Sequence, residues 1–278
     1  MIDHDHLTDK DHDRIAEFIN SKAGIQLPYH KRSLIEARLR RRQKVTQHQR
    51  LTDYINYALA DESDESIFLI DALTTNKTHF FREEAHFDFL KAFFAKPINR
   101  PKACLNVWSA GCSSGEEPYT LAMVLSELKE RNLIPDFQIL ATDISISVLA
   151  AARNAVYANE RLDGIPEHYR KRYLLRCKNP DRHVFRIAPE LRTKVKFDTF
   201  NLITGDFKDV PLQDIIFCRN VMIYFTAEQK NKIIASYYQR LSEKGMLFLG
   251  HSEGLTGKND HFEQVVPTVY QRAKLCLK

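Results

Sequence analysis

The sequence predicts an α/β protein with an open, largely parallel sheet, preceded by a small all-helical domain. Three observations lead to this fold class. A short apolar run that begins at Val107 enters a glycine-containing loop and then an amphipathic helix. A second buried strand, residues 137–141, ends just before Asp143. Residues 11–71, in contrast, carry only apolar spacings that are typical of helices.

The first quarter of the chain contains four groups of apolar residues at helical spacing. The groups are Ile15, Phe18 and Ile19; Leu34, Ile35 and Leu39; Tyr54, Ile55, Ala58 and Leu59; and Ile67, Phe68, Ile70 and Leu73. Gly24 and Pro28 separate the first two helices, and Pro97 and Pro101 mark a turn before the first strand of the sheet. We therefore predict a helical domain over residues 1–72 and a second domain over residues 73–278.

The composition is that of an ordinary soluble protein, with 44% hydrophobic and 28% charged residues. No apolar run is as long as a membrane span, and the first ten residues are polar, so we expect a cytoplasmic protein without a signal peptide. The five cysteines lack C-x-x-C spacing, which argues against disulfides and a zinc site. We interpret His4, His6 and His12, which are interleaved with aspartates, as a solvated chain end rather than a metal site.

Positive charge is concentrated in the second predicted helix. Between Lys31 and Arg50 the chain carries eight cations and one acid, Glu36. Such a stripe is often only a solvated face, but like charges at this density repel one another unless an anion neutralises them. Nucleic acid and an acidic helical protein are the two candidate partners.

The loop after the first strand carries Gly111 and Gly115, which allow a sharp bend and a close approach of a ligand. It is neither a G-x-G-x-x-G nor a Walker loop, and it has no Lys-Ser/Thr for phosphate. Asp143 lies where this class of fold places the carboxylate that binds ribose hydroxyls. A glycine loop that lacks a phosphate-binding side chain, followed by a carboxylate placed to bind ribose hydroxyls, favours a nucleoside ligand such as S-adenosylmethionine.

A polar segment precedes the sheet and reads L-T-T-N-K-T-H-F-F-R-E-E. Two interpretations are open. In the first, it is a helix end with two core aromatics and a surface arginine. In the second, it folds over the ligand pocket, where Asn76 and Thr78 offer hydrogen bonds and Arg82 offers a cation.

The second half of the chain interrupts and then resumes the sheet. Residues 167–196 read as a short helix plus a small antiparallel β-subdomain, after which strands follow at 195–197 and 214–218. Open α/β sheets bind ligands at the carboxyl ends of their strands. We therefore expect Asn201, Arg219, Asn220 and Tyr224 at the pocket that Gly111 opens.

The last strands complete the topology. Residues 246–250 form a strand, and F-E-Q-V-V and T-V-Y-Q pair readily as a hairpin. An antiparallel hairpin at the edge of an otherwise parallel seven-stranded, Rossmann-like sheet is the topology of class I S-adenosylmethionine-dependent methyltransferases.

At this point the sequence resembles the CheR family, the bacterial chemotaxis methyltransferases that esterify glutamates on chemoreceptors. Five segments in the order of the family carry the resemblance: T-T-N-K-T-H-F-F-R-E, W-S-A-G-C-S-S-G-E-E-P-Y, A-T-D-I-S, F-C-R-N-V-M-I-Y-F and G-H-S-E. The resemblance covers nearly the whole chain.

The resemblance implies roles for individual residues. The cofactor-site residues that it implies are Asn76, Thr78, Arg82, Glu117, Asp143, Asn201, Leu202, Arg219 and Asn220, beside Gly111 of the loop. Arg82 and Tyr224 fall where the active-site Arg and Tyr of the family lie beside the transferred methyl group. The β-subdomain matches one that in some members docks a peptide from the C-terminus of the receptor, and the helical domain matches one thought to meet the methylation helices of the receptor.

Some of these assignments have structural alternatives. Glu117 follows Ser114 by three residues and could form a capping box, although we favour a ligand contact. Tyr224 could be a core aromatic at a strand end. Asp143 needs a partner wherever it lies, because a carboxylate at a buried strand end is costly alone. His251 and Glu253 have no role that the sequence assigns, and we place them at the rim of the pocket.

The resemblance implies methyl transfer from S-adenosylmethionine to a glutamate oxygen, with S-adenosylhomocysteine as the other product and sensory adaptation as the role. We expect Arg82 or Arg219 to hold the carboxylate and Tyr224 to orient it. We expect an enzyme recruited to membrane receptor arrays, with no membrane insertion and no nucleic-acid partner. An RNA methyltransferase and a non-catalytic sensor of S-adenosylmethionine are the alternatives; the former needs aromatics among the cations of residues 31–50, which are absent.

Overall fold

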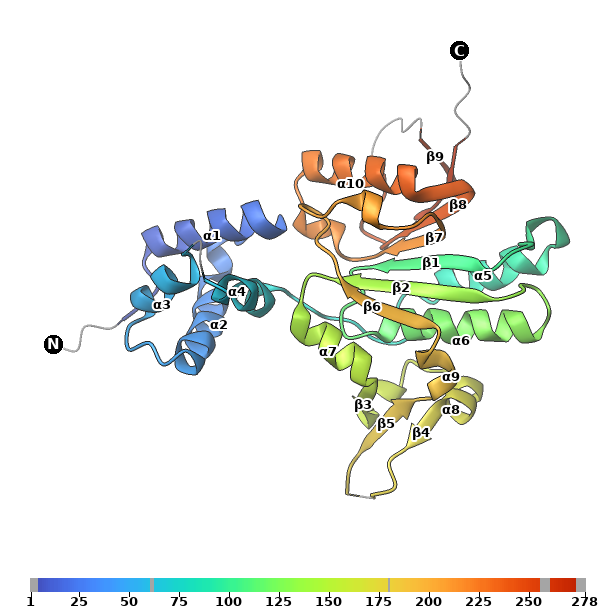
Figure 1. Cartoon of the computed structure of the whole chain (residues 1–278), viewed down its shortest axis with the longest axis horizontal. Helices are drawn as coiled ribbons and strands as arrows, with labels where there is room; N and C mark the ends of the chain where they lie inside the picture. The colour runs from blue at the N-terminus through green and yellow to red at the C-terminus, as the bar shows by residue number, and fades with distance from the viewer. Residues whose placement is uncertain (1–4, 61–62, 180, 256–260, 274–278) are drawn as a thin grey trace, which may run out of the picture. The chain divides into compact units, whose positions relative to one another are not determined.

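The structure is a computed structural model and describes residues 5–60, 63–179, 181–255 and 261–273 (Figure 1). The chain divides into two compact units. The first contains residues 1–75, 201–205 and 224–230, and the second contains the rest of the chain. The break after Thr75 falls close to the boundary predicted near residue 72, but two short later segments join the first unit by their contacts.

The first unit is helical, as predicted. Its helices are α1 (Asp9–Ala23), α2 (Arg32–Val45), α3 (Leu51–Ala58) and α4 (Glu65–Leu73), with the short η1 (Tyr29–Lys31) before α2. Their apolar faces meet in one core that includes Ile15, Leu39 and Tyr54. The Thr8 side chain caps α1, and Gly24, at φ +70°, ends it.

The histidine-rich end of the chain is more ordered than we expected. His12 lies in α1, is 1% exposed and stacks on Tyr29 with ring centroids 4.3 Å apart. The prediction of a solvated end is therefore wrong for His12, because α1 begins at Asp9 and turns that residue inward. His4 lies outside the described residues.

The second unit is built on a seven-stranded sheet with the order β6-β2-β1-β7-β8-β10-β9. The strands are β1 (Leu105–Ala110), β2 (Phe137–Asp143), β6 (Val195–Thr199), β7 (Gln213–Cys218), β8 (Leu241–Leu249), β9 (Phe262–Val266) and β10 (Val269–Arg272). The five strands from β6 to β8 are parallel, and β10 and β9 form an antiparallel edge. This is the predicted class I topology.

Helices cover both faces of this sheet. They are α5 (Ala85–Ala95), α6 (Glu116–Glu130), α7 (Ile146–Asn154), the short α9 (Pro189–Arg192) and α10 (Ala227–Arg240). Alternate side chains of β1 point to opposite faces. Val107 joins the core cluster that α5 and α6 share, whereas Trp108 contacts Tyr237 of α10 with ring centroids 5.4 Å apart.

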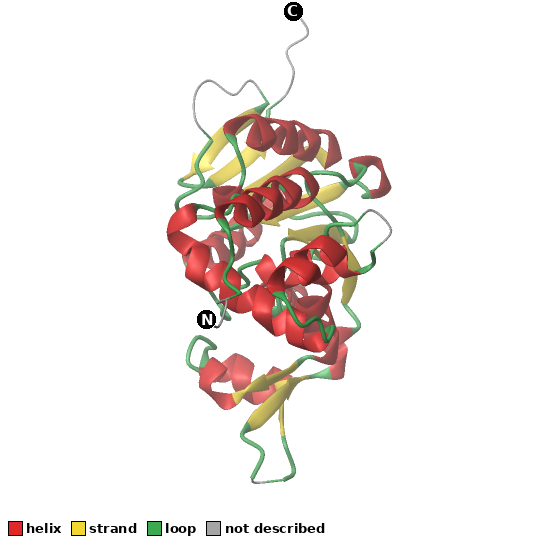
Figure 2. Ribbon diagram, turned by 90° about the vertical axis from the view of Figure 1, so that its left-hand side faces the viewer, coloured by secondary structure: helices red, strands yellow, loops and turns green. Residues whose placement is uncertain are grey.

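A second, three-stranded antiparallel sheet forms the β-subdomain, seen at the bottom of Figures 1 and 2. Its strands, in the order β3-β5-β4, are β3 (Val156–Ala158), β4 (Leu174–Arg176) and β5 (Val184–Ile187), and α8 (Glu167–Tyr173) precedes β4. This sheet begins at Val156, earlier than the predicted start at 167. Three residues are too few to show an alternating pattern, so only pairing with β5 reveals β3.

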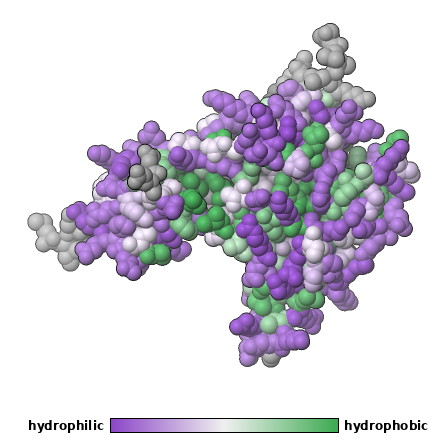
Figure 3. Space-filling view, viewed as in Figure 1, coloured by the Kyte–Doolittle hydropathy of each residue, from purple (hydrophilic) through white to green (hydrophobic). Residues whose placement is uncertain are grey.

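The cations of residues 31–50 are less isolated than the sequence suggested. Arg42 forms a two-pronged ion pair with Glu65 of α4, at 2.7 and 2.8 Å, and Arg40 pairs with Glu36. Arg38 donates to the carbonyl oxygens of residues 73 and 74. Besides Arg38, four cations of this stripe have no acidic partner within the described ranges, and all four are exposed: Lys31, Arg41, Lys44 and Arg50. Figure 3 shows a mainly hydrophilic face on this helical unit.

Two further sequence expectations concern cysteines and membranes. The described cysteines, at positions 104, 112, 177 and 218, are all free thiols, and Cys276 lies outside the described residues. Among the described residues, no helix has the length and apolar character needed to cross a membrane.

Candidate functional site

The glycine loop after β1 bends at Gly111, as the sequence predicted, and the group that lies against Gly111 is the Val221 side chain. Gly111 has φ +90°, and a Cβ there would lie only 2.4 Å from Val221 Cγ2, so a larger residue would be both strained and crowded. The amides of Gly111 and Cys112 donate to the Thr142 carbonyl oxygen at 2.8 and 2.9 Å. The loop is therefore tied to the carboxyl end of β2.

Asp143 ends β2 and finds its partners in backbone amides. Its carboxylate accepts hydrogen bonds from the amides of Ser113, at 2.8 Å, and Ser145, at 3.0 Å, and the residue is 8% exposed. The hydroxyl of Ser113 in turn donates to the Asn76 carbonyl oxygen at 3.4 Å. Asn76, the glycine loop and Asp143 thus lie together at the carboxyl edge of the sheet. Thr78 is half-buried and follows Asn76 in the same segment.

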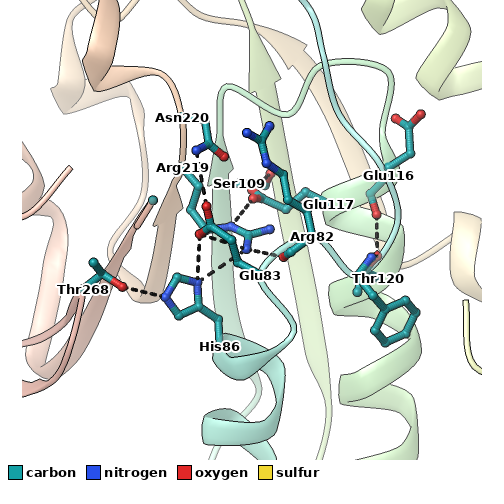
Figure 4. A network of polar contacts seen from close by, with 12 residues as sticks. Arg82, Glu83, His86, Ser109, Glu116, Glu117, Thr120, Arg219, Asn220 and Thr268 are labelled. Atoms are coloured by element: carbon teal, nitrogen blue, oxygen red, sulfur yellow. Dashed lines mark hydrogen bonds and ion pairs between the residues drawn. The ribbon is translucent and has the colours of Figure 1, made fainter. Parts of the chain in front are cut away.

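Glu117, in the first turn of α6, takes part in a buried ion pair (Figure 4). Its carboxylate accepts from Ser109 Oγ at 2.6 Å and from Arg219 Nε at 2.7 Å. The capping-box alternative is wrong, because Ser114 donates to Glu116 instead, at 2.7 Å. Burial of both charges explains the pairing, since either one alone would be costly in the core.

Arg219 follows β7 and is the hub of this network (Figure 4). Besides pairing with Glu117, it donates to the Arg82 carbonyl oxygen at 2.6 Å, and its Nη1 lies 3.7 Å from Glu83 Oε2. Its guanidinium also lies over the rings of Phe87 and Phe217, 5.2 and 5.4 Å from their centroids. With only 6% of the residue exposed, Arg219 serves as an internal counter-ion.

His86 closes the network on the side of the C-terminal hairpin. Its Nδ1 lies 3.4 Å from Arg219 Nη1, which can only donate, so Nδ1 accepts and Nε2 carries the proton toward Thr268 Oγ1 at 2.8 Å. Burial, together with the charge of Arg219, lowers the pKa of His86 to about 4. His86 is therefore a neutral structural histidine at physiological pH.

Arg82 lies on a strained turn between two left-handed residues, Phe81 at φ +54° and Glu83 at φ +56°. Phe80 and Phe81 are core aromatics, as the first of the two interpretations of this segment states. The Arg82 side chain is half-exposed and donates to the Lys77 carbonyl oxygen at 2.9 Å. Among the described residues, no carboxylate pairs with its guanidinium.

Asn220 has a left-handed backbone, with φ +59°, directly after Arg219. Its amide donates to Glu253 Oε2 at 2.5 Å, and its side-chain Nδ2 donates to Glu83 Oε1 at 3.3 Å. The remaining polar atom, Oδ1, is buried and has no partner in the part of the chain that the structure describes. An unpaired buried acceptor is costly, so Oδ1 calls for a donor from a ligand.

Three predicted residues belong to the first unit by their contacts. Asn201 donates through Nδ2 to the Lys22 carbonyl oxygen at 2.6 Å and accepts through Oδ1 from the Ile203 amide at 2.9 Å. Leu202 is half-buried beside it. The Tyr224 hydroxyl lies 3.5 Å from the Thr75 carbonyl oxygen, and Tyr224 is also half-buried.

Sequence reasoning missed several members of the network. Glu83, His86 and Ser109 carried no assigned role, and Glu253 was left at the rim. Polar residues inside otherwise apolar runs were the available signal, as with Ser109 within β1. Their partners come from elements distant in the chain, so spacing could not identify them.

Glu83, His86 and His251 place ligand atoms within 4.8 Å of one another, a grouping that could suit a metal ion. The guanidinium of Arg219 already lies beside two of them, at 3.7 Å from Glu83 and 3.4 Å from His86. A divalent cation at this place would be repelled by the guanidinium charge. We therefore interpret the three side chains as the surroundings of Arg219 rather than as metal ligands.

The arrangement fits S-adenosylmethionine on chemical grounds. Asp143 offers a carboxylate at the end of β2, beside the glycine loop, and Asn220 Oδ1 is a buried acceptor that needs a donor. Hydroxyl and ammonium groups, both present on this nucleoside, are such donors. No phosphate-binding side chain is needed for this ligand.

Comparisons with known proteins identify the family. The model "CheR methyltransferase, SAM binding domain" matches residues 76–271, and "CheR methyltransferase, all-alpha domain" matches residues 10–74. Among its relatives, the chemotaxis protein methyltransferase of Borreliella burgdorferi is 37% identical, covering 96% of this chain and 95% of the relative. Chemotaxis protein methyltransferase 2 of Pseudomonas aeruginosa is 35% identical, covering 96% and 95%. The Escherichia coli chemotaxis protein methyltransferase is 36% identical, covering 96% and 92%. The chain therefore belongs to the CheR family of S-adenosylmethionine-dependent methyltransferases.

Proposed function

We propose that this enzyme methylates glutamate side chains of methyl-accepting chemotaxis receptors, giving glutamate 5-O-methyl esters and S-adenosylhomocysteine. The observation that carries the choice of a carboxylate substrate is Arg82, a half-exposed guanidinium on a fixed turn with no carboxylate partner among the described residues. The relatives that are named chemotaxis protein methyltransferases supply the class of substrate.

Residues of several segments would hold the cofactor. We assign Asp143 to its ribose hydroxyls, Asn220 Oδ1 to a donor group, and Asn76, Thr78 and Gly111 to the contacts around the loop. Asn201 and Leu202 take the adenine side, as the family resemblance implies. Glu117 and Arg219 support the cofactor site through their buried ion pair. When bound, S-adenosylmethionine supplies an activated methyl group on a positively charged sulfur.

The residues of the chain then have an orienting task rather than a proton-transfer task. A glutamate side chain is already ionised at neutral pH, so no general base is required. Catalysis by proximity requires the carboxylate oxygen to be held in line and water to be excluded. Arg82 holds the carboxylate by a charge-assisted hydrogen bond, because the other candidate, Arg219, is committed to Glu117 and to the Arg82 carbonyl.

Recognition of the receptor involves surfaces beyond the site. We assign the exposed cations of α2 and its flanks, Lys31, Arg41, Lys44 and Arg50, to an acidic surface on the methylation helices of the receptor. The β-subdomain would take a receptor peptide in those receptors that carry one. These contacts recruit a cytoplasmic enzyme to membrane receptor arrays, with neither nucleic acid nor membrane insertion involved.

The function is tested by transfer of labelled methyl groups from S-adenosylmethionine to receptor-containing membranes, followed by mild alkali. We expect label on a receptor band that alkali releases as methanol, because a carboxyl methyl ester is base-labile. Membranes without receptors are the control. Base-stable label would contradict the glutamate assignment and favour another methyl acceptor, such as RNA; tight cofactor binding with no transfer would favour a sensor.

Tyr224 is the residue to which we assign the second contact with the carboxylate. Tyr224→Phe removes only the hydroxyl, so turnover should fall on the order of tenfold or more while cofactor affinity changes little. Steady-state kinetics and calorimetry with S-adenosylhomocysteine measure the two effects. Equal losses in turnover and in cofactor affinity would contradict the orienting role.

A further inference from the structure

Two carboxylates, of which Glu253 is buried and Glu83 is partly buried, converge on Asn220 from different segments. Glu83 comes from the turn before α5, and Glu253 follows β8. Glu83 accepts from the Asn220 side chain at 3.3 Å, and Glu253 accepts from the Asn220 backbone amide at 2.5 Å. Figure 4 shows Glu83 and Asn220 facing each other beside Arg219.

Glu253 organises the turn after β7 through the backbone. Its carboxylate accepts from the amides of Asn220, Gly250 and Ile223, at 2.5, 2.9 and 3.1 Å. It is 8% exposed, and no cation of the described ranges pairs with it. Converging amides thus replace a counter-ion, as in backbone anion nests.

Gly250 shows how closely these groups are packed. A Cβ at this position would lie 2.6 Å from Glu253 Oε2, 2.8 Å from Asn220 Nδ2 and 2.9 Å from Asn220 N. Such distances leave no room for a side chain. The two turns can therefore meet, and Glu253 can reach Asn220, only because residue 250 is glycine.

Glu83 decides which end of the Asn220 amide faces the ligand. An ionised carboxylate only accepts hydrogen bonds, so Asn220 must present its NH₂ group to Glu83. The carbonyl Oδ1 then faces the other way, where it is buried without a partner among the described residues. Glu83 is itself held, because its Oε1 also accepts from the His251 amide at 3.3 Å.

We infer that Glu83 and Glu253 are positioning residues for the cofactor: Glu83 fixes the amide orientation of Asn220, and Glu253 fixes its left-handed backbone. This inference rests on the cofactor contact that we assigned to Asn220 under the proposed function. It gives the G-H-S-E segment its role, which is to clamp the turn after β7 rather than to transfer a proton. It also assigns a role to Glu83, the residue directly after Arg82.

Calorimetric titration of the full chain with S-adenosylhomocysteine tests the inference. Glu83→Gln allows residue 83 to donate and hence the Asn220 amide to flip, and Glu253→Gln replaces an acceptor by a donor among three amides. Each should weaken binding by about tenfold. Two exposed glutamates, Glu84 beside Glu83 in the chain and Glu263 on β9, provide matched controls, and we expect Glu84→Gln and Glu263→Gln to bind like the wild type.

Both carboxylates are tested in an Asn220→Gly background, because glycine accepts the positive φ but has no side chain. There, neither Glu83→Gln nor Glu253→Gln should weaken binding further, since the side-chain contact that each of them positions is already lost. A full additional loss from Glu83→Gln in this background would overturn the inference for Glu83. Wild-type affinity in Asn220→Gly itself would overturn the contact on which the inference rests.

Kinetics separate positioning from damage to the fold. Positioning predicts a raised KM for S-adenosylmethionine with kcat at saturation nearly unchanged, whereas partial unfolding lowers kcat alone. If Glu253→Gln does not fold, Gly250→Ala crowds the same contact without changing any charge and should raise the same KM. An unchanged KM in a folded Gly250→Ala variant would overturn the role of Glu253. The membrane assay tests the proposed function separately, since ester formation by the wild type does not depend on either carboxylate variant.

Discussion

The two arginines of the site differ in nearly every physical respect. Arg219, at the end of β7, is 6% exposed and donates both to a buried carboxylate and to a carbonyl oxygen. Arg82, on the turn before α5, is half-exposed and donates to the carbonyl of Lys77. One of the contacts of Arg219 is the carbonyl of Arg82 itself, so the buried arginine holds the turn that carries the exposed one.

From this difference we propose that Arg219 supports the fold of the site and that Arg82 contacts the substrate. A substrate carboxylate that used Arg219 would have to compete with Glu117 for a guanidinium from which water is excluded, and breaking a buried pair is costly. Arg82 has no such competitor among the described residues. The sequence left open which of the two arginines holds the substrate carboxylate; on the basis of their surroundings we propose Arg82.

Loss of Arg219 should have the largest effect, and the effect should be on stability. Arg219→Ala leaves Glu117 as an unpaired buried charge and should lower the free energy of unfolding by about 3–5 kcal/mol. Urea unfolding monitored by circular dichroism measures it. The double variant Arg219→Met with Glu117→Leu removes both charges and should recover much of the loss. An Arg219→Ala variant as stable as the wild type would remove the distinction between the two arginines.

Loss of Arg82 should instead affect catalysis. Arg82→Ala should lower kcat for receptor methylation on the order of 100-fold, because the substrate carboxylate loses its orienting contact. The free energy of unfolding should change by less than about 0.5 kcal/mol, as for other surface substitutions. Arg82→Lys keeps the charge and should lose less activity. Normal turnover in Arg82→Ala would contradict the assignment.

The neutral His86 beside Arg219 predicts how stability depends on pH. Its folded pKa of about 4 lies below the ordinary value of 6.5, so the unfolded chain binds the proton more readily. The contribution of His86 is fully present above pH 6.5 and is lost as pH falls toward its folded pKa of about 4. About 2 kcal/mol should disappear between about pH 7 and about pH 5.

Urea unfolding at these two pH values, for the wild type and for His86→Gln, isolates this contribution. The variant cannot titrate at this position, so its stability should fall less with acidification. Equal pH dependence of the two proteins would show that Arg219 and burial do not depress the pKa of His86.

Salt should produce the smallest effect and should act on only one arginine. Raising the ionic strength from about 0.05 to about 0.5 M screens exposed charges but hardly affects buried pairs. The ratio of wild-type to Arg82→Ala activity should therefore shrink about two- to threefold, while the stability lost in Arg219→Ala stays constant. Assays and unfolding curves at both salt concentrations measure the two responses. A salt-sensitive Arg219 pair would argue that water reaches it.

Much of the fold follows from local patterns. The helical unit, the parallel strands, the glycine loop and the C-terminal hairpin each rest on periodicity or turn chemistry, and the structure contains all of them. Thr226 and Gln229, three residues apart at the start of α10, form a capping box with reciprocal bonds of 2.9 and 3.3 Å, another feature set by neighbouring residues. Short elements such as β3 were missed, because three residues do not establish a period.

By itself, the sequence determined the class of fold, the glycine loop after the first strand and the set of polar residues at the strand ends, because these depend on residues near one another in the chain. Only the tertiary structure decided their partners. Glu117 meets Arg219 across 102 positions, and Asn220 meets Glu83 across 137. Whether a charged side chain binds a ligand or supports another residue depends on which groups from distant parts of the chain are buried beside it. Local sequence spacing does not identify those groups.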